Sequence, residues 1–213
     1  MGDQPDDAGS SSSRSRRTTD IHWSHPCIDL LKNPNITESD LSGHILHEVS
    51  TAHSFLIDFK EKYAKLAMDS TQDNQWAARL EMIRGIPMPF LNTTPPDNPY
   101  IFNSQLLHAY EKMQRLAVGI EQATLDQALY QGDLLQDFRT IETHIVKILC
   151  QLRYAMVNQE LEPPVSVTKM IMSERYRDLE GTSERSIRDS IIVRDYNAAI
   201  DDLKDVFVTF ENQ

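Results

Sequence analysis

Apolar side chains recur at alternating spacings of three and four residues along most of the chain from residue 38 onward. This spacing places them along one side of an α-helix, so it predicts long amphipathic helices. The first helix follows Thr37-x-x-Asp40, a capping-box pattern whose side chains satisfy free N–H groups at a helix start. Its predicted apolar stripe consists of Leu41, Ile45, Val49, Ala52, Leu56, Phe59, Tyr63 and Leu66.

Three further stripes predict three further helices. The second helix has Asn103 or Ser104 available as its N-cap. The third ends before Pro163-Pro164, because a helix does not continue through proline, and the fourth spans roughly residues 186 to 211. The three stripes are Leu106, Tyr110, Met113, Ala117, Ile120 and Thr124; Leu134, Phe138, Ile141, Ile145, Ile148, Leu152 and Met156; and Ile192, Tyr196, Ala199, Leu203, Val206 and Phe210.

The connections between these helices differ in length. About 33 residues rich in proline join the first to the second, Gly132-Asp133 separates the second from the third, and about 25 residues precede the fourth. A short link forces antiparallel neighbours, whereas a long one can run the length of a helix and leave consecutive helices parallel. We therefore expect an all-α, long-chain four-helix bundle with up-up-down-down topology and long crossover loops, as in growth-hormone and cytokine bundles.

Residues 1–20 combine Asp, Gly, Ser and Arg with almost no apolar side chain. Such a composition does not offset the entropy lost on ordering, so it predicts a disordered tail before a single domain at residues 21–213. Within the tail, Arg14-Ser15-Arg16-Arg17 has the dibasic form that secretory-pathway proteases cut, which predicts processing after Arg17. A solvated charged tail and a weak nuclear-localisation signal are the alternatives.

Charge and hydropathy narrow the classes of partner. The net charge is −11, from 32 acidic and 21 basic residues, so neither nucleic acid nor an anionic membrane surface is an expected partner. No stretch approaches the ~18 consecutive apolar residues of a membrane-spanning helix, so we expect a soluble protein without membrane insertion. Residues 1–13 lack the apolar segment of a signal peptide, so export requires a leader outside this sequence or a leaderless route.

The sequence offers little for catalysis or metal binding. His22-x-x-His25 and His44-x-x-His47 each supply two imidazoles but no matching carboxylates, and no predicted helix contains the Glu-x-x-His of a di-iron bundle. With 7 glycines, the chain contains neither a phosphate-binding loop nor a nucleophile elbow. We expect no enzyme activity, no metal and no cofactor, and we interpret the histidines as surface or half-buried groups.

Four short segments, two of them around the cysteines, carry a family resemblance. The cysteines lie in His25-Pro26-Cys27 and in Lys147-Ile148-Leu149-Cys150-Gln151-Leu152, while Thr51–Ile57 falls in the first helix and Ile86-Pro87-Met88-Pro89-Phe90 in the first long connection. In order and spacing these segments resemble the group of leukaemia inhibitory factor, oncostatin M and ciliary neurotrophic factor, long-chain helical cytokines. The resemblance covers residues 25 to 160.

The resemblance implies a secreted growth factor, monomeric when free, that brings together class I cytokine receptor chains. The expected partners are the shared signal-transducing chain and a chain like the leukaemia inhibitory factor receptor, with Janus-kinase and STAT signalling downstream. It also implies a disulfide between Cys27 and Cys150. This bridge would close a loop of more than 100 residues and add on the order of 4 to 5 kcal/mol of stability. Alternatively, Cys27 is a free thiol and Cys150 a small buried apolar residue.

The family presents the outward faces of its first and third helices to the shared receptor chain. The family uses Phe-x-x-Lys at the start of the fourth helix to bind the second receptor chain. At this place the present sequence reads Ile187-Arg188-Asp189-Ser190. Interfaces concentrate their energy in aromatic and Arg anchors, which favours Arg139 and Tyr154. The residues expected to bind receptors are His47, Ser50, Ser54, Asp58, Gln136, Arg139, Thr143, Lys147 and Tyr154 on the first face, and Ile187, Arg188, Ser190 and Ile191 at the fourth helix.

Two N-glycosylation sequons fall in predicted connections, Asn35-Ile36-Thr37 and Asn92-Thr93-Thr94, where a glycan is sterically accessible. They agree with a secreted glycoprotein. The competing hypothesis is an intracellular four-helix adaptor or scaffold that acts through protein–protein contacts, because the same bundle serves unrelated functions.

Overall fold

The computed structural model describes residues 23, 25–27, 30–68 and 75–213. Their regular secondary structure is entirely helical, which confirms the predicted all-α class. The predicted tail at residues 1–20 and the processing site at Arg17 lie outside the described residues. Within the described part, no helix is both long and apolar enough to cross a membrane.

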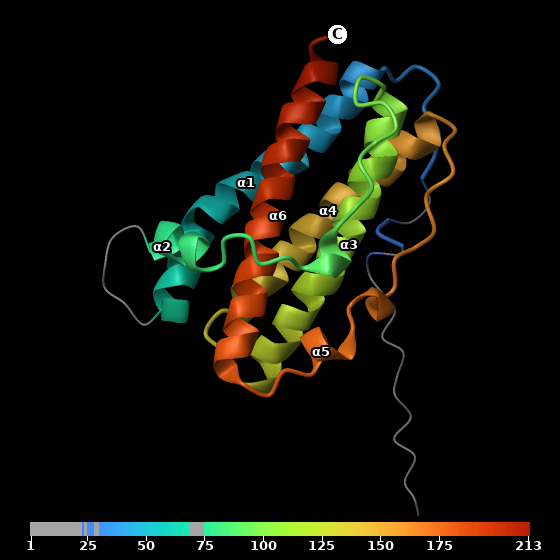
Figure 1. Cartoon of the computed structure of the whole chain (residues 1–213). Coiled ribbons are helices and arrows are strands. Elements are labelled where there is room, and N and C mark those ends of the chain that lie inside the picture. The colour runs from blue at the N-terminus through green and yellow to red at the C-terminus, as the bar shows by residue number, and fades with distance from the viewer. Residues whose placement is uncertain (1–22, 24, 28–29, 69–74) are drawn as a thin grey trace, which may run out of the picture.

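Four long helices form the body of the protein: α1 (Glu38–Met68), α3 (Phe102–Leu129), α4 (Leu135–Asn158) and α6 (Thr182–Glu211) (Figure 1). The capping box before α1 is confirmed, because the Thr37 N–H donates to Asp40 Oδ2 (3.0 Å) and the Asp40 N–H donates to Thr37 Oγ1 (3.1 Å). The predicted cap of α3 was wrong. Ile101 occupies the N-cap position without a side-chain hydrogen bond, and Ser104 Oγ accepts from the Asn98 N–H instead.

The four long helices pack in antiparallel pairs. Helix α1 lies against α6 and α4, and α3 lies against the same two helices. At one end of the α1/α6 pair, Ser39 Oγ donates to the Glu211 carbonyl (2.7 Å); at the other, Tyr63 Oη donates to the Ser186 carbonyl (3.1 Å). Phe102 at the start of α3 packs edge-on against aromatic rings near the end of α6. Each long helix therefore packs against two others around one central core.

The predicted stripes form this core. Of their members, Leu66 is exposed and Thr124 and Val206 are half-buried, and the rest are buried. Near the end of α1 the core is aromatic: the rings of Phe59, Tyr63 and Phe138 meet at centroid distances of 5.5 to 6.1 Å. Edge-to-face aromatic contacts of this kind add stability beyond the burial of their surface.

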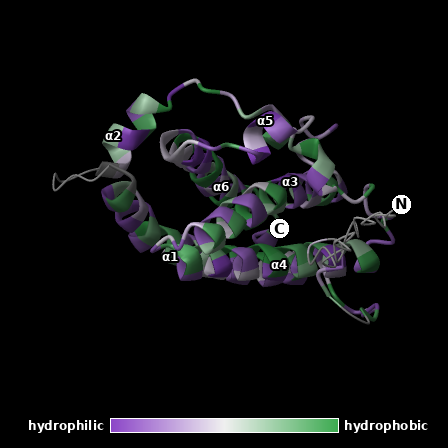
Figure 2. Cartoon of the chain, turned by 90° about the horizontal axis from the view of Figure 1, so that it is seen from below, coloured by the Kyte–Doolittle hydropathy of each residue, from purple (hydrophilic) through white to green (hydrophobic). Residues whose placement is uncertain are grey.

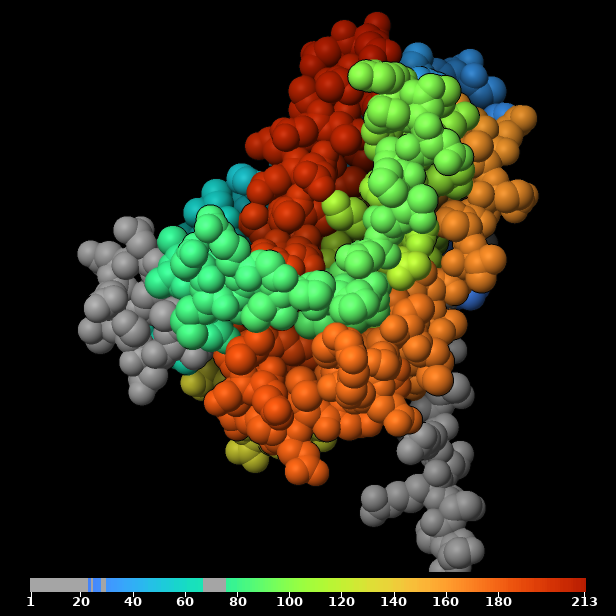
Figure 3. All heavy atoms as spheres, viewed as in Figure 1, coloured from blue at the N-terminus to red at the C-terminus, as the bar shows by residue number. Residues whose placement is uncertain are grey.

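Four short elements were not predicted: α2 (Gln75–Met82), α5 (Glu174–Arg177) and two 3₁₀ turns, η1 (Pro89–Leu91) and η2 (Lys169–Ile171). Helix α2 is the important one, because it packs against α1 and also contacts α6. In Figure 2 it lies outside the ring of long helices, on the side of α1. The chain then crosses the outside of α6 toward η1 (Figure 3). At the beginning of this crossing, Arg194 of α6 donates to the Ile83 carbonyl (3.0 Å).

Candidate functional site

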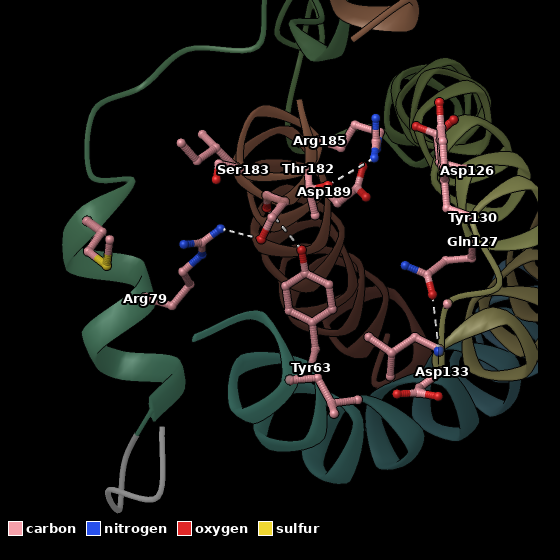
Figure 4. Close-up of a pocket in the computed structure, with 16 residues that line it drawn as sticks. Tyr63, Arg79, Asp126, Gln127, Tyr130, Asp133, Thr182, Ser183, Arg185 and Asp189 are labelled. Carbon is pink, nitrogen blue, oxygen red and sulfur yellow. Dashed lines mark hydrogen bonds between the residues drawn. The ribbon is translucent and has the colours of Figure 1, made fainter. Parts of the chain in front are cut away.

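A cleft of about 560 Å³ opens at one end of the bundle. Its walls are the end of α1, helix α2, the turn between α3 and α4, and the start of α6 (Figure 4). Polar and charged side chains from all four segments converge in the cleft. Its volume is within the size range of ligand pockets in proteins. The charged residues of the lining are Arg79, Asp126, Asp133, Arg185 and Asp189.

A buried ion cluster lies beside this cleft, and two of its members, Asp126 and Asp189, line the cleft. The Arg188 guanidinium donates to Asp189 Oδ1 (2.8 Å from Nε) and to Asp126 Oδ2 (2.7 Å from Nη2), and also to the Tyr176 carbonyl (3.0 Å). Burial alone would lower the pKa of Arg188, but the two carboxylates raise it overall, so the cation is retained. The cluster ties the start of α6 to the end of α3 and to the chain that leads into α6.

Burial raises the pKa of Asp189 to about 6, against the opposing influence of Arg188 and with a smaller upward contribution from Asp126. The folded state therefore takes up a proton more readily than the unfolded state, in which an Asp titrates near 3.9. As the pH falls from 7 to about 4, this group is expected to increase the free energy of unfolding by on the order of 2 kcal/mol.

Urea unfolding of the wild type and of Asp189→Asn between pH 4 and 7 measures this contribution. The wild type should gain stability on acidification relative to the variant, which has no carboxyl at this position. Asp205→Asn, at an exposed position of α6, is the control and should follow the wild type. Parallel curves for the wild type and Asp189→Asn would contradict the prediction.

Arg79 closes the cleft from the side of α2. Its guanidinium donates to Ser190 Oγ (2.7 Å from Nε) and to Ser186 Oγ (2.9 Å from Nη2), and its side chain is buried. Tyr63 Oη contacts Ser190 Oγ at 3.1 Å, and burial raises the pKa of Tyr63, so its hydroxyl stays protonated. These contacts fasten α2 to α6. Sequence reasoning missed Arg79, although it lies three residues after the buried Trp76 and four before the buried Ile83, the spacing of a core position.

The structure corrects the residues predicted at the start of the fourth helix. Arg188, Ser190 and Ile191 are buried, so in this structure they do not present side chains to a partner. The physical reason is that α6 begins at Thr182, earlier than predicted, and its first turns pack against α3 and α2. Of the four residues, Ile187 alone remains on the surface, with 39% exposure, and it lines the cleft.

The residues predicted on α1 and α4 are on the surface. Those on α1 are exposed, and on α4 only Tyr154 is half-buried, because it stacks on His44 with ring centroids 6.1 Å apart. At the same seam between the helices, the His144 ring packs against Phe55 (5.6 Å), and burial lowers the pKa of His144. The aromatic contacts of His44, Phe55 and His144 were not predicted. The sequence pattern that could have revealed them is a set of aromatic side chains at positions next to the core stripes.

The two cysteines are neighbours but are not bonded. Both are free thiols, with Cys27 Sγ 3.6 Å from the Cys150 carbonyl oxygen. Burial raises the pKa of Cys27 to about 12, and a hydrogen bond to the Cys150 side chain acts in the same direction. The predicted disulfide is therefore not formed in this structure, although the fold brings its two partners together across 123 positions of sequence.

The two predicted glycosylation sites lie on the surface. Asn35 and Asn92 are exposed and lie in connections between helices. No group of three or more potential metal-binding side chains occurs among the described residues. Comparisons with protein-family models, with curated proteins and with solved structures found no match for this chain.

Proposed function

We propose that this protein is a secreted helical cytokine that brings together class I cytokine receptor chains and so triggers Janus-kinase and STAT signalling. The observation that supports this most is the pairing of the long helices. Ser39 at the start of α1 donates to the Glu211 carbonyl at the end of α6, and Phe102 at the start of α3 packs on Phe210 near the same end. These contacts support the part of the proposal in which α1 and α3 run in one direction and α4 and α6 in the opposite one.

The connections agree with this up-up-down-down proposal. Five residues, 130–134, separate α3 from α4, whereas residues 69–101 join α1 to α3 and residues 159–181 join α4 to α6. Links of the latter lengths can cross over the bundle, as the cytokine topology requires. The proposal also draws on the resemblance of the cysteine-containing segments to the leukaemia inhibitory factor group.

Two surfaces serve the proposed mechanism. The exposed faces of α1 and α4 would bind the shared signal-transducing chain, and the cleft beside Ile187 would bind the second chain. A packed bundle holds the two surfaces at a fixed separation, so simultaneous binding brings the cytoplasmic tails of the receptors together. Their associated kinases then phosphorylate each other and the STAT proteins.

In cells that display the shared receptor chain and candidate second chains, the purified protein is expected to induce STAT phosphorylation. The Arg139→Ala/Tyr154→Ala variant should need about thirtyfold more protein for half-maximal response, because truncating two interface anchors costs about 2 kcal/mol of binding free energy in total. Arg84→Ala/Tyr100→Ala removes the same residue types from exposed positions elsewhere and is the matched control. The absence of a response with every receptor pair would contradict the proposal.

One observation favours the alternative of an intracellular adaptor: both cysteines are free thiols, the state that a reducing compartment maintains. Expression in cultured cells separates the two proposals. A cytokine should appear in the medium, oxidised at Cys27 and Cys150, glycosylated at Asn35 and Asn92, and cut after Arg17. An adaptor should stay in the cell, reduced, uncut and without glycans.

A further inference from the structure

A half-buried histidine lies in the seam where α1 packs against α4. The ring of His144 on α4 packs against Phe55 on α1 at a centroid distance of 5.6 Å, and its Nδ1 atom is buried. Among the described residues, no hydrogen-bond partner reaches this nitrogen. A buried nitrogen without a partner is unfavourable, and a charged N–H at the same place is more unfavourable still. The packing at this point therefore favours the neutral imidazole.

The surroundings of His144 offer little compensation for a positive charge. Burial lowers the pKa of His144 below the 6.5 of an ordinary histidine, and Lys147, one turn further along α4, acts in the same direction. Glu48 on α1 raises this pKa, but it has the smallest influence of the three. The neutral ring thus stabilises the folded seam. This contribution is lost as the pH falls below about 6.5, where the histidine of the unfolded chain takes up a proton.

The seam lies within the surface that the proposed function assigns to the shared receptor chain. Phe55 directly follows Ser54, and His144 directly follows Thr143; Ser54 and Thr143 are both exposed and belong to the residues expected to bind that chain. A partner that covers this face would also remove water from the exposed part of the His144 ring. Further desolvation disfavours the charged imidazole, so binding of the partner and protonation of His144 oppose each other.

The other histidine of the seam tolerates a charge. His44 stacks on Tyr154 with ring centroids 6.1 Å apart, but it is exposed and interacts electrostatically with Asp40, one turn earlier in α1. A proton on His44 therefore meets a carboxylate, an aromatic face and water, all of which stabilise a cation. His144 is the histidine of this seam whose packing depends on its protonation state.

We propose that His144 is a pH switch, which releases the partner from the α1/α4 face when the complex is acidified. Uptake of a proton drives the ring out of its contact with Phe55 toward water, because the charged N–H needs a hydrogen-bond partner. The middle of the seam then opens, and the two helices no longer hold the binding residues at one spacing. Acidified compartments at about pH 5 to 6 are where such a histidine switch acts. The inference rests on the proposed function, because it regulates the surface assigned to the shared chain.

The first test measures binding of the ectodomain of the shared receptor chain to the whole protein, at neutral pH and at about pH 5.5. The wild type should bind about fivefold more weakly at the lower pH. His144→Phe keeps a ring against Phe55 but takes up no proton, so its affinity should change by less than about twofold. His108→Gln is the matched control and should lose affinity as the wild type does. His108 is also half-buried, but it lies on α3, and its Nδ1 contacts the Thr94 carbonyl (2.9 Å).

Hydrogen exchange reports on the seam without any receptor. Amide exchange in residues 51–58 and 140–147 is compared between the wild type and His144→Phe at equal pH, so that the direct effect of pH on exchange cancels. The ratio of the wild-type rate to the variant rate should rise at least about threefold between neutral pH and pH 5.5. Circular dichroism melts verify that the variant is folded. If the phenylalanine is not accommodated, His144→Leu is the second apolar variant and should give the same results.

The proposal is overturned if the wild type and His144→Phe lose the same affinity on acidification, or if the exchange ratio does not rise. Equal losses with intact binding at neutral pH would contradict the switch but leave the cytokine proposal standing. An ectodomain that does not bind at neutral pH would instead contradict the proposed function at this face. The exchange ratio would then decide alone whether protonation of His144 opens the seam.

Discussion

Arg188→Ala is expected to lower the free energy of unfolding by about 3 to 5 kcal/mol. Arg188 is 2% exposed and bridges Asp126 of α3 to Asp189 of its own helix. Its removal leaves two carboxylates together in a buried site, where neither is solvated and each repels the other. Since a domain of this size has a total stability of about 5 to 15 kcal/mol, the change removes a large part of it.

Urea unfolding at neutral pH measures this effect, and Lys62→Ala is the matched control. Lys62 also pairs with a carboxylate, Asp137 at 2.7 Å, but its side chain is 51% exposed, so its loss should cost no more than about 1 kcal/mol. A triple variant, Arg188→Met with Asp126→Leu and Asp189→Leu, should recover most of the stability, because none of the three charges of the cluster is then left buried without its partner. An Arg188→Ala protein as stable as Lys62→Ala would show that the cluster does not hold these helices together.

The long helices were predictable because their stripes run for six to eight core positions each, and a pattern of that length rarely arises outside a helix. Helix α2 has 8 residues, and two of the side chains that place it, Trp76 and Ile83, stand at its edges. A segment this short has no stripe to recognise. Its position is set by tertiary contacts, above all the hydrogen bonds from Arg79 to α6.

The ion cluster was missed for a different reason. Continuing the stripe of α6 backward from Ile192 in steps of three and four reaches Asp189, Arg188 and Arg185, all buried in the structure. The period was therefore present in the sequence, but charged residue types suggested a solvated surface. Whether an arginine at a core position is paired depends here on a carboxylate from α3, Asp126, which lies 62 positions away. Sequence spacing within one helix does not contain that information.

Oxidation of Cys27 and Cys150 to a disulfide is expected to raise the free energy of unfolding by about 4 to 5 kcal/mol, with a rise in melting temperature of about 10 °C. The two residues are 123 positions apart, so the bond would greatly restrict the unfolded chain while its partners are already neighbours in the folded one. Because burial raises the pKa of Cys27 to about 12, little of the reactive thiolate exists at neutral pH. Spontaneous oxidation should be slow, and a glutathione redox buffer with a disulfide isomerase is the suitable treatment.

Intact mass under non-reducing conditions, together with thermal unfolding of the oxidised and reduced forms, checks this prediction. Cys27→Ser is the control, since it keeps the buried environment of Cys150 but forms no bond, and its melting temperature should not change with the oxidant. If the wild type forms the bond without gaining stability, strain in the folded state must cancel the entropic effect. If it does not form the bond at all, the thiol pair is a reduced packing contact, and the adaptor hypothesis gains over the secreted cytokine.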